Sequence, residues 1–172
     1  LIPEISLTPQ TEKRFRDRFN VPIVTLHSGL TDKNRLAAWT SAKTGEARII
    51  LGTRSAVFTP LCQPGLIIVD EEHDQSYKQH EGFRYSARDL AVIRARRENI
   101  SIILGSATPS IESLNNCAAD RYQHLVLTDR AGKAVQPTWS IVDLKNEQCE
   151  AGIAASTLAK IRQTVEQGQQ VL

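Results

Sequence analysis

The sequence contains no methionine, only three cysteines and few aromatic residues, which make up 5% of the chain. Because an initiating methionine is lacking, we expect a mature product or a piece of a longer protein. The cysteines, Cys62, Cys117 and Cys149, lie far apart and form no C-x-x-C pair. This spacing argues against a disulfide framework and a self-contained zinc site, and it fits a reducing cytosol.

Long apolar runs and an excess of one charge are also missing. No run approaches the roughly 20 residues that a bilayer span needs, so we expect a soluble protein with no membrane partner. The net charge is only +2, from 21 basic and 19 acidic residues, which excludes a polycationic nucleic-acid coat. A local basic groove stays possible, because summed charge says nothing about where the charges lie.

Short apolar runs alternate with amphipathic stretches, which is typical of βαβ units around a parallel sheet. We predict strands at 21–26, 47–51, 66–69 and 100–104, and helices at 9–19, 31–45, 86–97 and 109–117. The last two strands are continuous apolar runs and are expected to be buried on both faces. The helix that begins after Ser86 is expected to face inward through Ala87, Leu90 and Ile93. The pattern therefore favours an α/β fold.

The pattern loosens in the last third of the chain. We predict strands at 124–127 and 140–144, a linker at 128–137 between them, and a final helix at 154–167. Gly168 is expected to end that helix.

An acidic tetrapeptide, Asp70-Glu71-Glu72-His73, follows the third predicted strand. Ligands bind at the carboxyl ends of strands in open parallel sheets. In magnesium-dependent phosphoanhydride hydrolysis, one carboxylate holds Mg²⁺ and a second orients and deprotonates the attacking water. Acidic residues also end strands as helix caps, so the tetrapeptide alone leaves both interpretations open.

Two hydroxyl residues, Ser106 and Thr108, follow the fourth predicted strand. We expect them at the neighbouring strand end, within reach of Glu72 or His73. A nucleotide-driven motor needs such a contact to pass the state of its phosphate site to another surface. Thr108 is also expected to cap the following helix, with Pro109 at the first helical position.

Five segments along the chain carry a family resemblance: LIPEISLTPQ (1–10), LHSGL (26–30), GTRSA (52–56), DEEHDQSYKQHEGFRY (70–85) and GSATPS (105–110). Together they resemble motifs of superfamily 2 helicases, and more closely those of the PriA family of primosomal replication-restart helicases. The resemblance spans essentially the whole chain, and the stretch from 70 to 85 is its most specific part.

The resemblance implies a three-layer, RecA-like P-loop NTPase lobe built on a parallel sheet, without its P-loop strand and helix. Residues 1–127 would form the first helicase lobe, and residues 128–172 the inter-lobe linker and the start of the second lobe. The implied activity of the parent protein is ATP-driven 3′-to-5′ DNA unwinding at stalled replication forks.

The resemblance also assigns roles to individual residues. Asp70 matches the residue that holds Mg²⁺ and Glu71 the residue that activates water, while four further residues match a coupling function: Glu72, His73, Ser106 and Thr108. Eight residues fall where this family contacts or senses single-stranded DNA: Thr8, Thr53, Arg54, Tyr77, Lys78, Phe83, Arg84 and Tyr85.

Two of these DNA assignments have physical support in the sequence. Arg54 stands in a strand-to-turn junction, where a guanidinium and backbone N–H groups can converge on one phosphate. The segment 77–85 interleaves aromatic and basic side chains, which suits stacking on unpaired bases. Arg54 could equally be a solvated arginine in a plain turn, and Tyr85 could be a core residue under the next helix.

The resemblance further implies ATP and Mg²⁺ as cofactors, with zinc only in a downstream part of the parent. The implied partners are single-stranded and forked DNA, primosome proteins and single-stranded DNA-binding protein, in the bacterial cytoplasm near the nucleoid. The P-loop pattern G-x-x-x-x-G-K-[ST] is absent from the sequence. We therefore expect the chain alone to turn over ATP negligibly.

Two other functions stay open at this point. Another superfamily 2 DNA translocase, of the branch-migration or restriction type, would share the acidic and hydroxyl motifs but would not be expected to carry the segment 77–85 in this form. A non-catalytic DNA-binding or interaction module could retain a degenerate RecA-like lobe. A P-loop encoded shortly before Leu1 would favour a motor over such a module.

Overall fold

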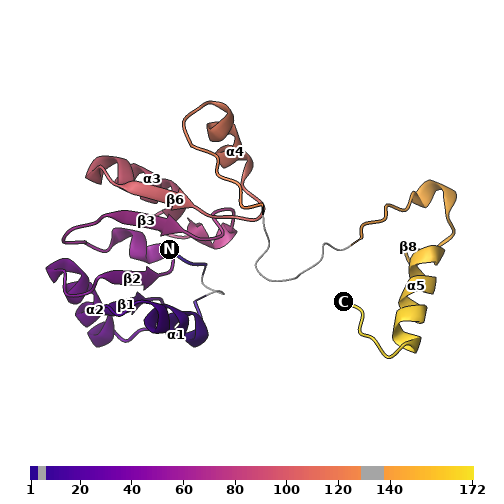
Figure 1. The fold of residues 1–172 in the computed structure, drawn as a ribbon, viewed down its shortest axis with the longest axis horizontal. Coiled ribbons are helices and arrows are strands. Elements are labelled where there is room, and N and C mark those ends of the chain that lie inside the picture. Colours follow the sequence, from indigo (N-terminus) through magenta and orange to yellow (C-terminus); the bar gives the residue numbers. More distant parts are fainter. Residues whose placement is uncertain (4–6, 129–137) are drawn as a thin grey trace. The chain divides into compact units, whose positions relative to one another are not determined.

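The structure, a computed structural model, describes residues 1–3, 7–128 and 138–172. The chain divides into two compact units, Leu1–His124 and Leu125–Leu172 (Figure 1). The predicted linker at 128–137 lies, except for its first residue, outside the described residues. The assignment of 1–127 and 128–172 to two helicase lobes stays a prediction.

The first unit alternates strands and helices as an α/β fold requires. Its elements, in chain order, are α1 (Pro9–Arg18), β1 (Ile23–Leu26), α2 (Asp32–Thr44), β2 (Ile49–Gly52), η2 (Arg54–Phe58), β3 (Leu66–Val69), η3 (Gln75–Tyr77), β4 (Lys78–Gln79), β5 (Tyr85–Ser86), α3 (Ala87–Glu98), β6 (Ser101–Leu104) and α4 (Ile111–Ala118). The four strands and four helices predicted for this part of the chain are all present, and no end differs from its predicted position by more than two residues.

The main strands form two parallel pairs. β1 pairs with β2 so that Ile23 lies opposite Ile49, and β3 pairs with β6 so that Val69 lies opposite Leu104. The first residues of the chain lie between the pairs. Ile2 N donates to Gly52 O at 3.0 Å, and Asp70 N donates to the carbonyl of Leu1 at 3.0 Å. The parallel α/β arrangement predicted from the sequence is therefore confirmed.

Side-chain caps fix where several helices begin. Thr8 accepts a hydrogen bond from Thr11 N and caps α1, and Ser86 caps α3 through Asp89 N. The cap predicted at Thr108 is wrong, because α4 is capped by Ser110, two residues later. Thr108 N instead donates to Ser106 Oγ at 3.0 Å, which keeps this part of the chain in the loop between β6 and α4.

Small side chains form the inward face of α3. Ala87, Ala91 and Ala95 recur every fourth residue and are buried, whereas Ile93 is 49% exposed and does not face inward as predicted. Leu90, the third residue of the predicted face, is only partly buried. Because alanine is small, the axis of α3 can approach β3 and β6 closely. The same alanines form no stripe of large apolar side chains, so the sequence pattern does not reveal this face.

The prediction that β3 and β6 are buried on both faces is wrong for the described residues. Val69 is fully buried, but Leu66 and Ile68 are each 48% exposed, and Ile103 of β6 is 51% exposed. Alternate residues of a strand point to opposite faces, and α3 packs on the face that carries Ile67, Val69, Ile102 and Leu104. In the described residues, each apolar run therefore forms a strand, but the strand is buried on one face and partly exposed on the other.

The second unit contains η4 (Leu144–Asn146), a short antiparallel pair of β7 (Cys149–Glu150) and β8 (Ile153–Ala154), and α5 (Ala155–Glu166). The predicted final helix is confirmed, and Gly168 follows it with a left-handed φ of 72°. The strands predicted at 124–127 and 140–144 do not form. Their apolar side chains find no partner strand among the described residues; Leu127 is 94% exposed and Ile141 is 99% exposed.

None of the described helices combines the length and the apolar character needed to cross a membrane.

The alanine face of α3 yields a stability prediction. Ala91→Leu is expected to lower the free energy of unfolding by about 1–3 kcal/mol, because the added atoms overpack a fully buried position. Ile93→Ala is expected to change it by less than about 1 kcal/mol, because half of that side chain is in solvent. Urea denaturation of both variants measures the difference, and a larger loss in Ile93→Ala would contradict this packing.

Candidate nucleotide and nucleic-acid sites

The pairing of β3 with β6 continues into the loops that follow both strands. Gly105 N donates to Val69 O at 2.8 Å, and Glu72 N donates to Gly105 O at 2.9 Å. The acidic tetrapeptide and the two hydroxyl residues therefore lie at adjoining strand ends, as the parallel topology predicts.

His73 contacts both predicted hydroxyl residues. Its Nδ1 lies 2.7 Å from Ser106 Oγ, and its Nε2 lies 3.4 Å from Thr108 Oγ1. Glu71 Oε2 is 3.6 Å from the same Nδ1. One imidazole thus bridges the acidic loop after β3 and the hydroxyl loop after β6, and a displacement of either loop must strain these contacts.

Glu71 and Asp70 differ in backbone and in exposure. Glu71 has a left-handed φ of 46°, a conformation that costs a non-glycine residue of order 1–3 kcal/mol and often occurs at functional sites. Asp70 is exposed. Its main chain is held by Leu1 O and by the Tyr77 hydroxyl, but its carboxylate has no hydrogen bond among the described residues. That carboxylate is available to an external ligand.

A divalent metal fits Asp70 only together with a phosphate ligand. The described residues contain no group of three or more His, Cys, Asp or Glu side chains that could hold a metal by themselves. One open carboxylate is nevertheless what Mg²⁺ uses at nucleotide sites, where phosphates and water supply its other ligands. The three cysteines are free thiols in this structure.

Glu72 does not contact the hydroxyl pair, in contrast to one of the two predicted alternatives. It is 2% exposed and accepts hydrogen bonds from Ser110 N at 2.6 Å, from Ser113 Oγ at 3.0 Å and from Arg88 Nη1 at 3.1 Å. Burial acts to raise the pKa of Glu72, but these hydrogen bonds outweigh it and lower the pKa. Glu72 therefore fastens the start of α4 to the acidic loop.

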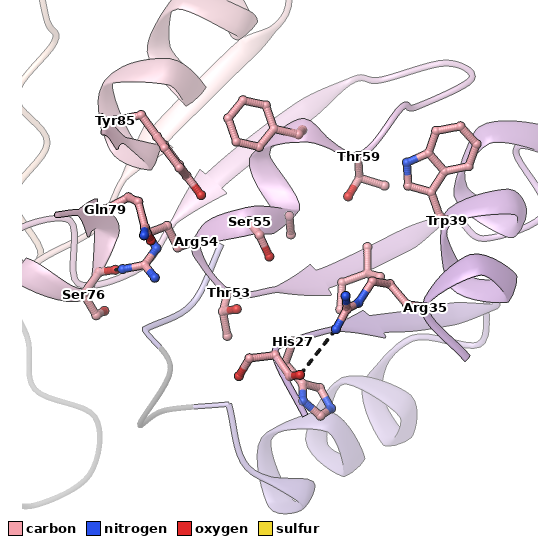
Figure 2. Close-up of a pocket in the computed structure, with 14 residues that line it drawn as sticks. His27, Arg35, Trp39, Thr53, Arg54, Ser55, Thr59, Ser76, Gln79 and Tyr85 are labelled. Carbon is pink, nitrogen blue, oxygen red and sulfur yellow. Dashed lines mark hydrogen bonds between the residues drawn. The ribbon is translucent and has the colours of Figure 1, made fainter. Parts of the chain in front are cut away.

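A second candidate site is a pocket of about 440 Å³ on the first unit (Figure 2). Thr53, Arg54 and Ser55 line it from the junction of β2 and η2, Trp39 from α2, and Tyr85 from β5. Hydroxyl, guanidinium and aromatic groups in a pocket of this size suit one nucleotide of a nucleic acid.

Arg54 reaches from this pocket to the segment after the acidic loop. Its Nη1 donates to the carbonyls of Ser76 at 3.1 Å and Lys78 at 3.0 Å. Thr53 is buried, at 6% exposure, and its N–H donates to Leu26 O at 3.1 Å. Thr8 does not line this pocket; its hydroxyl is occupied as the cap of α1.

Three aromatic side chains form a row beside Arg54. The rings of Phe58 and Tyr85 meet edge to face with centroids 5.0 Å apart, and Phe83 lies 6.0 Å from Tyr85. Phe58 is 55% exposed and Phe83 is 78% exposed. We call Phe58, Tyr85 and Phe83 the aromatic row. The sequence prediction missed Phe58, although its position four residues after Arg54 places it in the same short 3₁₀ helix.

Tyr77 cannot stack on a base in this conformation, contrary to the sequence prediction. It is 1% exposed, packs beside Val57, Val69, Ala87 and Ala91, and donates its hydroxyl to Asp70 O at 2.7 Å. Burial and the neighbouring carboxylates raise the pKa of Tyr77 well above its ordinary value. Lys78 is half-buried in β4, while Arg84 is exposed in the turn between β4 and β5.

The sequence of the chain matches a family of known proteins. Residues 1–117 match the DEAD/DEAH box helicases. The whole chain is 51% identical over 172 residues to the replication restart protein PriA of Haemophilus influenzae, of which it covers 24%. It is 38% identical over 175 residues to PriA of Bacillus subtilis, of which it covers 22%.

A third relative, PriA of Synechocystis, is 45% identical over 152 residues; the match covers 86% of the chain and 18% of that protein. The chain spans about a quarter or less of the length of these relatives. The resemblance stated from the motifs is confirmed, and so is the RecA-like α/β class that the helicase match implies.

The Glu72 hydrogen bonds yield a prediction about acid stability. Because the pKa of Glu72 is lower in the folded than in the unfolded chain, the unfolded chain takes up this proton first as the pH falls. The resulting stability is fully present above the ordinary value of 4.5 and is lost as the pH drops through the folded value.

Denaturation between pH 7 and pH 3 measures this effect. Glu72→Gln is expected to flatten the acid dependence of the unfolding free energy, whereas the matched change Glu12→Gln leaves it steep, because Glu12 forms only a surface pair with Arg16. An unchanged acid dependence in Glu72→Gln would contradict the assignment.

Proposed function

Because the chain belongs to the DEAD/DEAH box helicases, we propose that it is part of the ATP-driven motor of a replication-restart DNA helicase. The observation that carries this proposal is the contact of His73 with Ser106 and Thr108, which joins the loops after β3 and β6. The similarity to PriA proteins over the whole chain favours the replication-restart type over other superfamily 2 translocases.

In this proposal the loop after β3 performs the nucleotide chemistry. When bound with ATP, Mg²⁺ neutralises charge on the phosphates. The open carboxylate of Asp70 would hold the metal directly or through its water, and Glu71 would orient and deprotonate the attacking water. Glu72 is held by its hydrogen bonds to the start of α4. His73 is the residue of this loop that contacts Ser106 and Thr108, and it would couple the nucleotide state to the loop after β6.

The pocket and the aromatic row would bind single-stranded DNA. Arg54 and Arg84 can neutralise phosphates, and the exposed rings of Phe58 and Phe83 can stack on unpaired bases. Lys78 and Tyr85 lie in the same hairpin and would support this surface, with Thr53 at the pocket floor. Thr8 would contact the single-stranded DNA outside this pocket.

The wider role is proposed by similarity to the PriA proteins. The whole protein would unwind DNA in the 3′-to-5′ direction at stalled or branched forks, with primosome proteins and single-stranded DNA-binding protein as partners. It would act in the bacterial cytoplasm at the nucleoid. Zinc, which the resemblance implies for the parent, would be held outside these 172 residues.

The nucleotide site is tested in the full-length protein that contains this chain. Glu71→Gln is expected to reduce DNA-stimulated ATP hydrolysis by about 10²–10⁴-fold, because the group that activates water is lost, while ATP binding persists. A coupled assay of phosphate release measures this. Glu112→Gln, the same change at an exposed carboxylate on α4, should keep the wild-type rate.

Full activity in Glu71→Gln would contradict this role of the acidic loop. The isolated 172-residue chain provides a further control: it has no P-loop pattern to position the phosphates, so negligible turnover is expected. Robust turnover by the isolated chain that disappears in Glu71→Gln would show that the P-loop is not needed.

The aromatic row is tested by DNA binding. Phe58→Ala and Phe83→Ala in the full-length protein are each expected to weaken binding of fluorescent oligo(dT) by about 5- to 150-fold, because one stacked base contributes about 1–3 kcal/mol. Phe19→Ala is the matched control, since Phe19, the C-cap residue of α1, has a partly exposed ring that stacks on Phe15 and does not line the pocket. Equal losses in all three variants would contradict a specific stacking surface.

A further inference from the structure

The end of η2 carries an exposed ring between two buried residues. Val57 and Thr59 are 7% and 4% exposed, whereas Phe58 is 55% exposed and lines the 440 Å³ pocket. Val57 belongs to the core cluster that also contains Val69 and Ala91. The side chains on both sides of Phe58 therefore point inward, and of these three residues Phe58 is the one that presents its side chain to solvent.

Arg94 of α3 holds the backbone on both sides of this ring. Its Nη1 donates to Val57 O at 2.8 Å and to Thr59 O at 2.7 Å. Its Nε donates to Glu98 Oε1 at 2.8 Å, and only 18% of the Arg94 side chain is exposed. Burying a guanidinium is unfavourable unless its N–H groups are hydrogen-bonded, so we expect these bonds to be kept and to fix the conformation at the end of η2.

Few other contacts fix this part of the backbone. Thr59 N donates to Ala56 O at 3.0 Å, and the described residues 59–65 form no helix or strand before β3 begins. The direction in which the Phe58 side chain points therefore depends on the two carbonyls that Arg94 holds.

Arg94 itself does not line the pocket, in contrast to Phe58 and Arg54. Thr59, whose carbonyl accepts from Arg94, is one of the lining residues (Figure 2). The backbone that Arg94 holds is therefore part of the pocket wall. An effect of Arg94 on a ligand in this pocket would pass through η2 and not through a direct phosphate contact.

We propose that Arg94 is a positioning residue of the DNA-binding surface, which holds η2 so that Phe58 can stack on an unpaired base. This proposal rests on the proposed function, in which the aromatic row binds single-stranded DNA, and it adds the residue that fixes one ring of this row. A ring that must first be ordered loses part of the stacking free energy to conformational entropy. Loss of the Arg94 contacts therefore removes the part of the binding that depends on bases and leaves the phosphate contacts in place.

The test uses Arg94→Gln in the full-length protein, with two fluorescent probes: oligo(dT) and an abasic oligonucleotide of the same length. Arg94→Gln is expected to weaken binding of oligo(dT) by about tenfold, within the range of one stacked base, and to leave binding of the abasic strand unchanged. Arg97→Gln is the matched control, because Arg97 lies on the same helix with an exposed side chain. It should bind both probes like the wild type.

A double variant shows whether Arg94 acts through Phe58. In that case Arg94→Gln adds less than about twofold to the loss of oligo(dT) affinity in Phe58→Ala, whereas independent effects would multiply. Arg94→Lys is the second variant if Arg94→Gln fails to fold. It keeps the charge, but an ammonium cannot hold two carbonyls in the fixed geometry of a guanidinium, so the same loss on oligo(dT) alone is expected.

The outcomes separate the two proposals. Wild-type protein that binds oligo(dT) no more tightly than the abasic strand, or Phe58→Ala that binds oligo(dT) like the wild type, would overturn the stacking surface of the proposed function. A loss on oligo(dT) in Phe58→Ala combined with wild-type binding in the Arg94 variants would overturn the positioning role of Arg94 alone. Equal losses on both probes in the Arg94 variants, or losses that multiply in the double variant, would also overturn that role.

Discussion

The parallel pairing of β3 with β6 is the constraint on which the proposed nucleotide site depends. Its register sets Val69 opposite Leu104, so the next residues of both strands leave the sheet at the same edge. The loop hydrogen bonds through Gly105 extend this pairing beyond the strands. In this register His73 contacts Ser106 and Thr108. A shift of one residue would turn the side chains of one strand to the other face.

The segment between the acidic loop and α3 contacts both candidate sites of the first unit. It is pinned to Asp70 through Tyr77 and to η2 through Arg54, and its hairpin carries two rings of the aromatic row. The Arg54 contact spans 22 residues, whereas Tyr77 and Asp70 are seven residues apart in the sequence.

Sequence reasoning found what topology alone dictates. The adjacency of Asp70 to the Ser106 loop follows from consecutive parallel strands, and the caps at Thr8 and Ser86 follow from local backbone chemistry. The predictions were wrong where tertiary packing decides which side chains are buried. Nothing in the sequence of the segment 77–85 shows which aromatic side chain is buried, and the alanine face of α3 forms no stripe of large apolar residues. Phe58 was missed because its contact with Tyr85 joins distant segments.

The central claim is that the loops after β3 and β6 form one nucleotide site. A crystal structure of the full-length protein with Mg²⁺ and a non-hydrolysable ATP analogue tests this claim most directly. The account predicts the metal at the Asp70 carboxylate, directly or through one water, with the terminal phosphate facing Glu71 and the His73–Ser106 contact. A nucleotide bound at another surface, with Asp70 remote from the metal, would contradict it.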